Sequence, residues 1–285
     1  MTDMNDYILT LSCPDQTGIV HNVTGWLLEK QGNILDAQQF GDEETQRFFL
    51  RIHFALPQAS PVSDLRDDFQ AIARRFDMDA RIYDARKKSR VLILVSRQGH
   101  CLNDLLFRVH SKQLPIEVAG IVSNHTDFQN MARAYGIPFH HLPVTPDTKA
   151  AQEQKILEIV EKENVDLVVL ARYMQILSDS LCRALQGRAI NIHHSFLPSF
   201  KGARPYHQAH ARGVKIIGAT AHYVTADLDE GPIIEQDIER VDHAMSAADL
   251  TQVGSDVESL VLARAVRSHV EHRILLNGQR TVVFR

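Results

Sequence analysis

The sequence predicts an α/β protein built from two domains, a small βαββαβ unit followed by a larger, mostly parallel sheet with helices on both faces. Two observations support this class. The first third alternates strand and helix patterns in the order of a split βαββαβ unit. The rest alternates β-branched apolar runs with helical segments, as parallel sheets do. A length of 285 residues fits about two domains. We expect them at residues 1–84 and 91–285, joined by a basic linker at 85–90.

In the first domain, the segment from Tyr7 to Cys13 alternates apolar and polar residues, as a half-buried strand does. Pro14 to Gly18 interrupts that strand, and Gly32-Asn33 ends the helical spacing that follows it. Two further strands flank a polar turn, as in a hairpin. The expected strands are residues 7–13, 34–40, 48–54 and 79–84, and the expected helices are 19–30 and 63–76.

In the second domain, short runs rich in Val, Ile and Leu predict buried parallel strands. Ligands of such sheets bind at the carboxyl ends of the strands, which makes those ends the place to look for a site. A long helical pattern and a short β-branched run close the chain. The expected strands are residues 91–96, 116–122, 165–170, 188–192 and 281–284, and the expected helices include 126–135, 149–162 and 253–277.

Composition excludes several classes of function. The formal net charge is −4 and no basic stripe occurs, which argues against nucleic acid as a partner. Cys13, Cys101 and Cys182 are scattered without a CxxC motif, which favours buried thiols in a reducing compartment over disulfides or zinc. No apolar run approaches membrane-spanning length, and the polar N-terminal segment is unlike a secretory signal. We therefore expect a soluble, cytoplasmic protein.

The pair Asn191 and His193 carries the clearest chemical signal. Residues two apart project to one face of an extended strand, so both side chains can enter one pocket. An amide N–H can stabilise a developing oxyanion while an imidazole moves a proton, which is the combination that acyl transfer needs. On spacing alone, an Asn-x-His at the end of a strand more often stabilises a turn than forms a catalytic pair.

The longer strings around this pair resemble the folate-dependent formyltransferase family. They are residues 191–202, Asn-Ile-His-His-Ser-Phe-Leu-Pro-Ser-Phe-Lys-Gly, and residues 217–234, in which an acidic residue precedes a glycine. The resemblance implies a Rossmann-like formyltransferase domain with Asn191, His193 and Asp229 as catalytic residues. It also implies that the segment after one strand lines a pteridine pocket, namely Leu170, Ala171, Arg172, Tyr173, Met174, Gln175, Ile176 and Leu177.

Each implied role has a physical basis and an alternative. Asn191 would donate to the oxyanion, and protonated His193 would add a donor and protonate the leaving nitrogen. Asp229 would raise the pKa of His193 or orient water, and its alternative is a loop cap before Gly231. Residues 170–177 are otherwise a plain strand-to-helix connection. Most of the other histidines near the motifs are expected to be partly buried, hydrogen-bonded rings; these are His194, His207, His210 and His222. A structural role is expected for His140-His141. No metal or cofactor is required.

The string Pro14-Asp15-Gln16-Thr17-Gly18-Ile19-Val20, followed by Gly32-Asn33-Ile34, resembles an ACT regulatory domain, which has a ferredoxin-like fold. The resemblance implies a small effector, such as an amino acid, near Asp15, Gly18, Ile19 and Asn33. The loop precedes a helix whose free backbone N–H groups suit a carboxylate. Exposed sheet edges favour a homo-oligomer. The alternative is a module that serves dimerisation alone.

The acceptor of the formyl group separates a transferase from a hydrolase. Glycinamide ribonucleotide formyltransferases resemble this chain but carry a phosphate-binding Gly-Ser-Asn turn, where this sequence has His100-Cys101. That difference leaves room for water as the acceptor. The segment Phe200 to Ala209 and the ACT-like domain resemble the formyltetrahydrofolate deformylases. The resemblance implies hydrolysis of 10-formyltetrahydrofolate to tetrahydrofolate and formate, with formate supplied to purine biosynthesis. Two alternatives remain: a formyltransferase acting on a nucleotide or aminoacyl-tRNA, and a non-catalytic amino-acid sensor.

Overall fold

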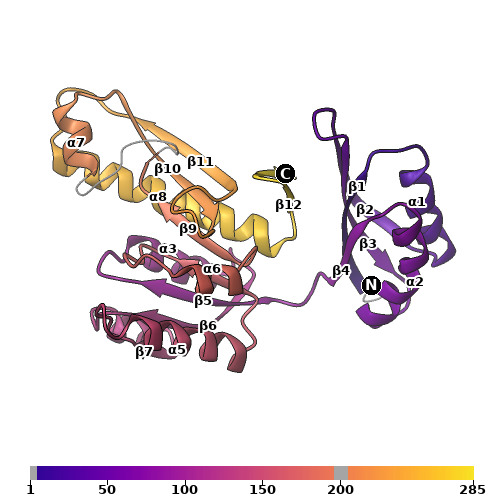
Figure 1. Ribbon diagram of the computed structural model, residues 1–285, viewed down its shortest axis with the longest axis horizontal. Coiled ribbons are helices and arrows are strands. Elements are labelled where there is room, and N and C mark those ends of the chain that lie inside the picture. Colours follow the sequence, from indigo (N-terminus) through magenta and orange to yellow (C-terminus); the bar gives the residue numbers. More distant parts are fainter. Residues whose placement is uncertain (1–4, 196–204) are drawn as a thin grey trace. The chain divides into compact units, whose positions relative to one another are not determined.

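The computed structural model describes residues 5–195 and 205–285, and it divides the chain into two compact units (Figure 1). Residues 1–88 and 271–285 form the first unit, and residues 89–270 form the second. The strand of the second unit begins at Ser89, close to the expected boundary at residue 91. Within the described ranges, no helix is long and apolar enough to cross a membrane.

The first unit contains the expected βαββαβ order. A four-stranded antiparallel sheet, in the order β2-β3-β1-β4, packs its apolar face against two helices. Trp26 on one helix and Phe69 on the other pack edge to face within this core, with ring centroids 5.0 Å apart. The elements are β1 (Asn5–Pro14), α1 (Ile19–Glu29), β2 (Asn33–Asp42), β3 (Arg47–Leu56), α2 (Val62–Arg75) and β4 (Asp79–Asp84).

The last fifteen residues correct the expected domain boundary and the expected final helix. The helical pattern predicted over 253–277 ends at Val270, and a hairpin of β12 (Ile274–Asn277) and β13 (Arg280–Val283) follows. His272 adopts a left-handed φ of 53°, which turns the chain out of the helix. The hairpin belongs to the first unit because Leu275 and Phe284 bury Phe49, and because Arg51 donates to the backbone carbonyl of Glu271 at 3.0 Å.

The second unit is a seven-stranded sheet in the order β11-β10-β9-β8-β5-β6-β7. The strands from β9 to β7 run parallel, and β10 and β11 add an antiparallel edge. The elements are β5 (Ser89–Val95), α3 (His100–His110), β6 (Ile116–Ser123), α4 (Gln129–Ala134), β7 (Phe139–His141), α5 (Lys149–Lys162), β8 (Leu167–Leu170), α6 (Asp179–Ala184), β9 (Ala189–His193), α7 (Pro205–Ala211), β10 (Ile216–Tyr223), β11 (Ile233–Arg240) and α8 (Ala247–Val270).

Helices cover both faces of this sheet, as its apolar strands require. Leu92 and Leu94 of β5 face α5 and α6, where Ile156 and Leu181 complete the core. On the other side, the long helix α8 packs along β9, β10 and β11 and against α3 (Figure 1). The strand order reverses at β5, which pairs with β6 on one side and β8 on the other. A crevice is expected at the carboxyl ends of the strands near such a reversal.

Candidate active site

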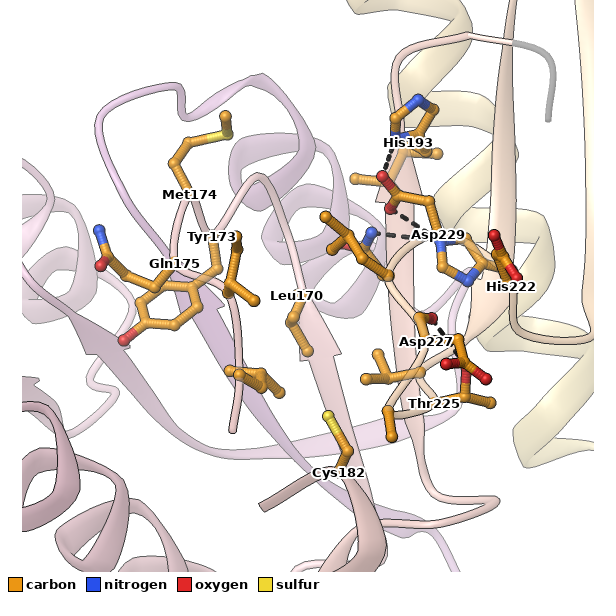
Figure 2. Close-up of a pocket in the computed structure, with 18 of the residues that line it drawn as sticks. Leu170, Tyr173, Met174, Gln175, Cys182, His193, His222, Thr225, Asp227 and Asp229 are labelled. Atoms are coloured by element: carbon orange, nitrogen blue, oxygen red, sulfur yellow. Dashed lines mark hydrogen bonds and ion pairs between the residues drawn. The ribbon is translucent and has the colours of Figure 1, made fainter. Parts of the chain in front are cut away.

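A cavity of about 610 Å³ opens at the carboxyl ends of β8 and β9. Three segments that are distant in sequence supply most of its lining: residues 170–177 at and after the end of β8, Asn191 to His194 at the end of β9, and residues 222–230 at the end of β10. Cys182 of α6 adds to it. Tyr173, Met174 and Gln175 lie on one side of it, and His193, Asp229 and His222 lie on the other (Figure 2). The cavity therefore lies where the sheet topology predicts a ligand.

Asp229 is the centre of the polar side of this cavity. Its Oδ2 lies 3.3 Å from His193 Nδ1, and its Oδ1 lies 3.7 Å from His222 Nε2. Figure 2 shows the carboxylate between the two imidazole rings. The hydrogen bond from His193 is the main cause that holds the pKa of Asp229 well below its ordinary value. Asp229 is therefore ionised at neutral pH, and the proton on His193 Nδ1 is directed toward it.

His222 orients the amide of Asn191. The Nδ1 atom of His222 lies 3.0 Å from the backbone carbonyl of Tyr223, which can only accept, so Nδ1 carries the proton. In the neutral ring Nε2 is then an acceptor, and Asn191 Nδ2 lies 3.3 Å from it. One amide N–H of Asn191 is used in this bond. The second N–H stays available to a ligand in the cavity.

The loop after β10 is built to bring Asp229 to this place. Asp229 has a left-handed φ of 58°, which Asp tolerates better than most residues. Two residues later, a Cβ on Gly231 would lie 1.7 Å from the backbone oxygen of Tyr223, so only glycine fits. The N–H of Tyr223 also donates to the carbonyl of Pro232 at 3.0 Å. The loop is therefore tied to the end of the strand that carries His222.

The opposite wall follows β8 and is mostly apolar. Of the eight residues expected here, seven line the cavity, and the exception is Ala171, which is fully buried beneath it. Met174 and Ile176 are 60% and 62% exposed, and Leu228 faces the same opening with 59% exposure. Apolar side chains exposed around a cavity suit a flat heteroaromatic ligand.

Comparisons with known proteins agree with this architecture. A model of the formyl transferase family matches residues 89–266, which is almost all of the second unit. A formyltetrahydrofolate deformylase of Corynebacterium sp. is 52% identical over the whole of both chains. The Escherichia coli enzyme of that name is 37% identical over 99% of this chain and all of its own length.

The chain belongs to the formyltetrahydrofolate deformylase family. A crystal structure of the Burkholderia mallei deformylase matches 99% of this chain and all of its own, with 52% identity and a TM-score of 0.95. By contrast, glycinamide ribonucleotide transformylase 1 of Symbiobacterium toebii matches only 70% of this chain, with 31% identity and a TM-score of 0.65. The full length of the chain therefore resembles deformylases, while the transformylase resembles part of it.

Several polar residues of this deformylase-family chain meet in a cluster that sequence alone does not predict. Glu258 of α8 is 1% exposed, and its carboxylate is shared by three partners. His100 Nε2 lies 2.7 Å away, Tyr206 Oη donates at 2.6 Å, and Arg172 Nε lies 3.3 Å away. Glu258 follows 86 residues after Arg172, within an ordinary helical pattern, so only the fold reveals the pair.

His100, Cys101 and Glu258 place three potential metal ligands within 4.8 Å of one another. The surroundings do not favour a metal there. Arg172 already supplies a positive charge to the Glu258 carboxylate. Burial strongly raises the pKa of the Cys101 thiol, and metal binding requires the thiolate. We therefore assign no ion to this cluster.

The remaining histidines differ from the sequence expectation in position. His222 is a buried, hydrogen-bonded ring as expected, but it lines the cavity and contacts Asn191. His207 and His210 are exposed on α7 rather than partly buried. His140 lies on the edge strand β7, away from the cavity. The part of the Phe200 to Ala209 motif before Pro205 lies outside the described residues.

The residues expected at an effector site lie in the first unit. Asp15 and Asn33 are exposed, and Ile19, the first residue of α1, is buried. Gly18 has a left-handed φ of 97° and caps the helix, and its carbonyl accepts a hydrogen bond from Asn22 Nδ2 at 2.8 Å. The loop therefore enters the helix by a glycine turn, as the sequence pattern suggests.

Proposed function

We propose that this protein hydrolyses 10-formyltetrahydrofolate to tetrahydrofolate and formate, with Asn191, His193 and Asp229 as catalytic residues. One observation carries the proposal: an ionised Asp229 bonded to His193 lies beside Asn191 at a partly apolar cavity. Full-length relatives named formyltetrahydrofolate deformylase support the choice of reaction. The formate released would support purine biosynthesis, as the family resemblance implies.

In the proposed reaction, the oxygen of a water attacks the formyl carbon, and the carbonyl electrons move to its oxygen. The second N–H of Asn191 donates to that oxyanion. The carboxylate of Asp229 orients the ring of His193 through Nδ1, and a proton passes from His193 to the folate nitrogen as the carbon–nitrogen bond breaks. One proton of the attacking water is returned to His193. The other stays on the formic acid product, which releases it to solvent and leaves as formate, so protons balance.

Residues 170–177 are proposed as the pteridine wall, with Leu228 on the opposite lip. A flat ring between apolar side chains leaves its polar edge to the backbone groups of this segment. Met174→Ala is expected to raise KM for the folate substrate several-fold with little change in kcat, because it removes contact made equally in the ground and transition states. A change confined to kcat would contradict this wall.

Formate release from 10-formyltetrahydrofolate, with no added acceptor, tests the proposed reaction. We expect multiple turnovers, and equal activity after chelator treatment followed by desalting. Turnover that requires glycinamide ribonucleotide would show a transferase instead. A chelator-sensitive rate that a divalent metal restores would contradict the metal-free scheme.

We also propose that the first unit binds a small effector, such as an amino acid, near Asp15, Gly18, Ile19 and Asn33, and that it pairs with a second copy. The edge strand β2 supports pairing, because Ile34, Leu35 and Phe40 are 39%, 45% and 45% exposed on it. Calorimetry with a panel of amino acids tests binding, and light scattering tests pairing. No heat from any of them would remove the effector, and a monomer would remove the pairing.

A further inference from the structure

Two adjacent histidines in the cavity have neighbours of opposite charge. The rings of His193 and His194 stack with centroids 4.6 Å apart and an interplanar angle of 23°. His193 Nδ1 faces the Asp229 carboxylate at 3.3 Å, whereas His194 Nδ1 faces the guanidinium of Arg172 at 3.0 Å. Arginine has only donors, so His194 Nδ1 must accept and its proton must lie on Nε2. The contact thus fixes one neutral tautomer of His194.

Arg172 can do this only because it is itself anchored. Its side chain is 7% exposed, and its backbone has a left-handed φ of 62°. Gln98 Oε1 accepts from its Nε at 2.8 Å, and Glu258 Oε2 lies 3.3 Å from the same nitrogen. Burial alone would raise the pKa of Glu258, but the hydrogen bond from His100 and the charge of Arg172 outweigh it and lower that pKa. The ionised carboxylate therefore balances the buried guanidinium.

Arg172 is also part of the segment proposed as the pteridine wall. Its carbonyl accepts from the N–H of Ser96 at 3.2 Å, and the N–H of Met174 donates to Ser96 Oγ at 2.9 Å. One residue thus connects the apolar wall, through its backbone, to the stacked histidines, through its side chain. An ion pair as deeply buried as this is weak evidence for stability, which makes a role in the site the better explanation of its retention.

We propose that Glu258 and Arg172 are positioning residues: they hold the His194 ring as a neutral tautomer stacked on His193, and so fix the His193 ring in line with Asp229. The inference rests on the proposed hydrolysis, in which His193 moves the proton. The two rings then have different roles: His193 exchanges a proton, and His194 stays neutral. The low pKa of His194, about 4 because of burial and then Arg172, agrees with this division.

Glu258→Gln tests the proposal, with Asp256→Asn as the matched control. The control makes the same carboxylate-to-amide change on the same helix, but at an exposed position. We expect Glu258→Gln to lower kcat by about 10- to 100-fold, with KM for the folate within about 3-fold, since a 1 Å misplacement of a reacting group can cost about 10²-fold. A folded Glu258→Gln protein with the wild-type kcat would overturn the proposal.

Nitrogen-15 spectra of histidine-labelled protein give a readout that does not depend on turnover. The His194 signals, assigned by their loss in His194→Gln, are expected to show an unprotonated Nδ1 and a protonated Nε2 at neutral pH. In Glu258→Gln we expect a mixture of tautomers. A protonated Nδ1 in the wild-type protein would overturn the proposal, even if hydrolysis is observed. Absence of hydrolysis with the expected tautomer would instead contradict the proposed function.

A second variant covers the case in which Glu258→Gln fails to fold. Arg172→Lys keeps a positive charge for Glu258, but a lysine lacks the planar fork that reaches Gln98, Glu258 and His194 together. We expect the same loss of kcat and the same mixture of tautomers at His194. Wild-type kcat and an unchanged His194 tautomer in this variant would overturn the proposal.

Discussion

At the scale of single residues, the adjacent rings of His193 and His194 differ in role because their neighbours carry opposite charges. The Asp229 carboxylate accepts a hydrogen bond from His193 Nδ1, whereas His194 Nδ1 faces the guanidinium of Arg172. Within the part of the chain that the structure describes, His193 Nε2 has no hydrogen-bond partner although it is buried. A buried nitrogen without a hydrogen-bond partner lowers the stability of the folded protein, so its presence in a site suggests that a ligand supplies the missing bond.

Asp229→Asn is expected to lower kcat by about 10²- to 10⁴-fold and to change KM for the folate little, because the carboxylate acts mainly on the transition state. Asn tolerates the left-handed φ of 58° at this position, so the loop is expected to keep its conformation. Steady-state formate release measures the effect, with Asp256→Asn as control. A kcat within a few-fold of wild type would show that Asp229 is a loop cap.

Gly231→Ala is expected to destabilise the second unit by about 2 kcal/mol or more and to lower kcat, because the new Cβ would overlap the backbone oxygen of Tyr223. Gly25 of α1 is the control, since a Cβ there meets no atom within 4 Å. Gly25→Ala should be neutral or stabilise by about 0.5–1 kcal/mol. Urea unfolding measures both. Wild-type stability and activity in Gly231→Ala would contradict the account of this loop.

At the scale of elements, the apolar periodicity of the sequence predicts most of the structure. The Asn191 and His193 strand is confirmed as β9, and both side chains line the same cavity, as residues two apart should. The end of α8 is not predicted, because residues 271–277 keep a helical apolar spacing. A left-handed turn at His272 and burial against Phe49 decide their structure, and neither is a local property.

The residues of the candidate site also fall into those that the sequence predicts and those that only the fold reveals. Asn191, His193 and Asp229 lie within short motifs, so the sequence indicates them directly. Glu258 and Arg172 meet only through the packing of α8 near the end of β8, and His222 joins the site because it pairs opposite Asn191 in the sheet. Contacts of this kind depend on topology, which a single sequence does not specify.

The end of α8 carries a partly buried histidine that should give the second unit a pH-dependent stability. Tyr223 Oη lies 2.7 Å from His269 Nδ1, and burial lowers the pKa of His269 to about 4, from an ordinary value of 6.5. Between these values the unfolded chain binds a proton that the folded chain does not. Stability should therefore fall as pH decreases from about 6.5 to about 4, and His194 acts in the same direction.

His269→Gln is expected to reduce this slope by up to about 1.4 kcal/mol per pH unit, since it removes one linked proton. Urea unfolding of the second unit between pH 4.5 and 7.5, followed by hydrogen exchange in residues 89–270, measures the slope. His243→Gln, at an exposed position, is the control and should keep the wild-type slope. An unchanged slope in His269→Gln would show that the ring is protonated in the folded protein.

At the scale of the whole molecule, the first unit is assembled from both ends of the chain. Arg51 is 6% exposed and donates to the carbonyls of Glu271 and His272, while Asn277 and Arg280 contact Asp42. Among the residues that the structure describes, those that line the cavity all lie between 170 and 230. The sequence between the two ends therefore holds the candidate active site, and the last fifteen residues stabilise the other unit.

Phe284→Ala is expected to destabilise the first unit by about 3 kcal/mol, because it empties the contact with Phe49 and Leu275. The single tryptophan of the sequence, Trp26, lies in the core of that unit, so its fluorescence reports the unfolding of the first unit alone. Leu276→Ala is the control on the same hairpin, since Leu276 is 46% exposed. We expect the Trp26 transition of Phe284→Ala to move to lower urea, while formate release below that transition stays at the wild-type rate. A Trp26 transition that stays at the wild-type position in Phe284→Ala would show that the hairpin contributes nothing to the stability of the first unit.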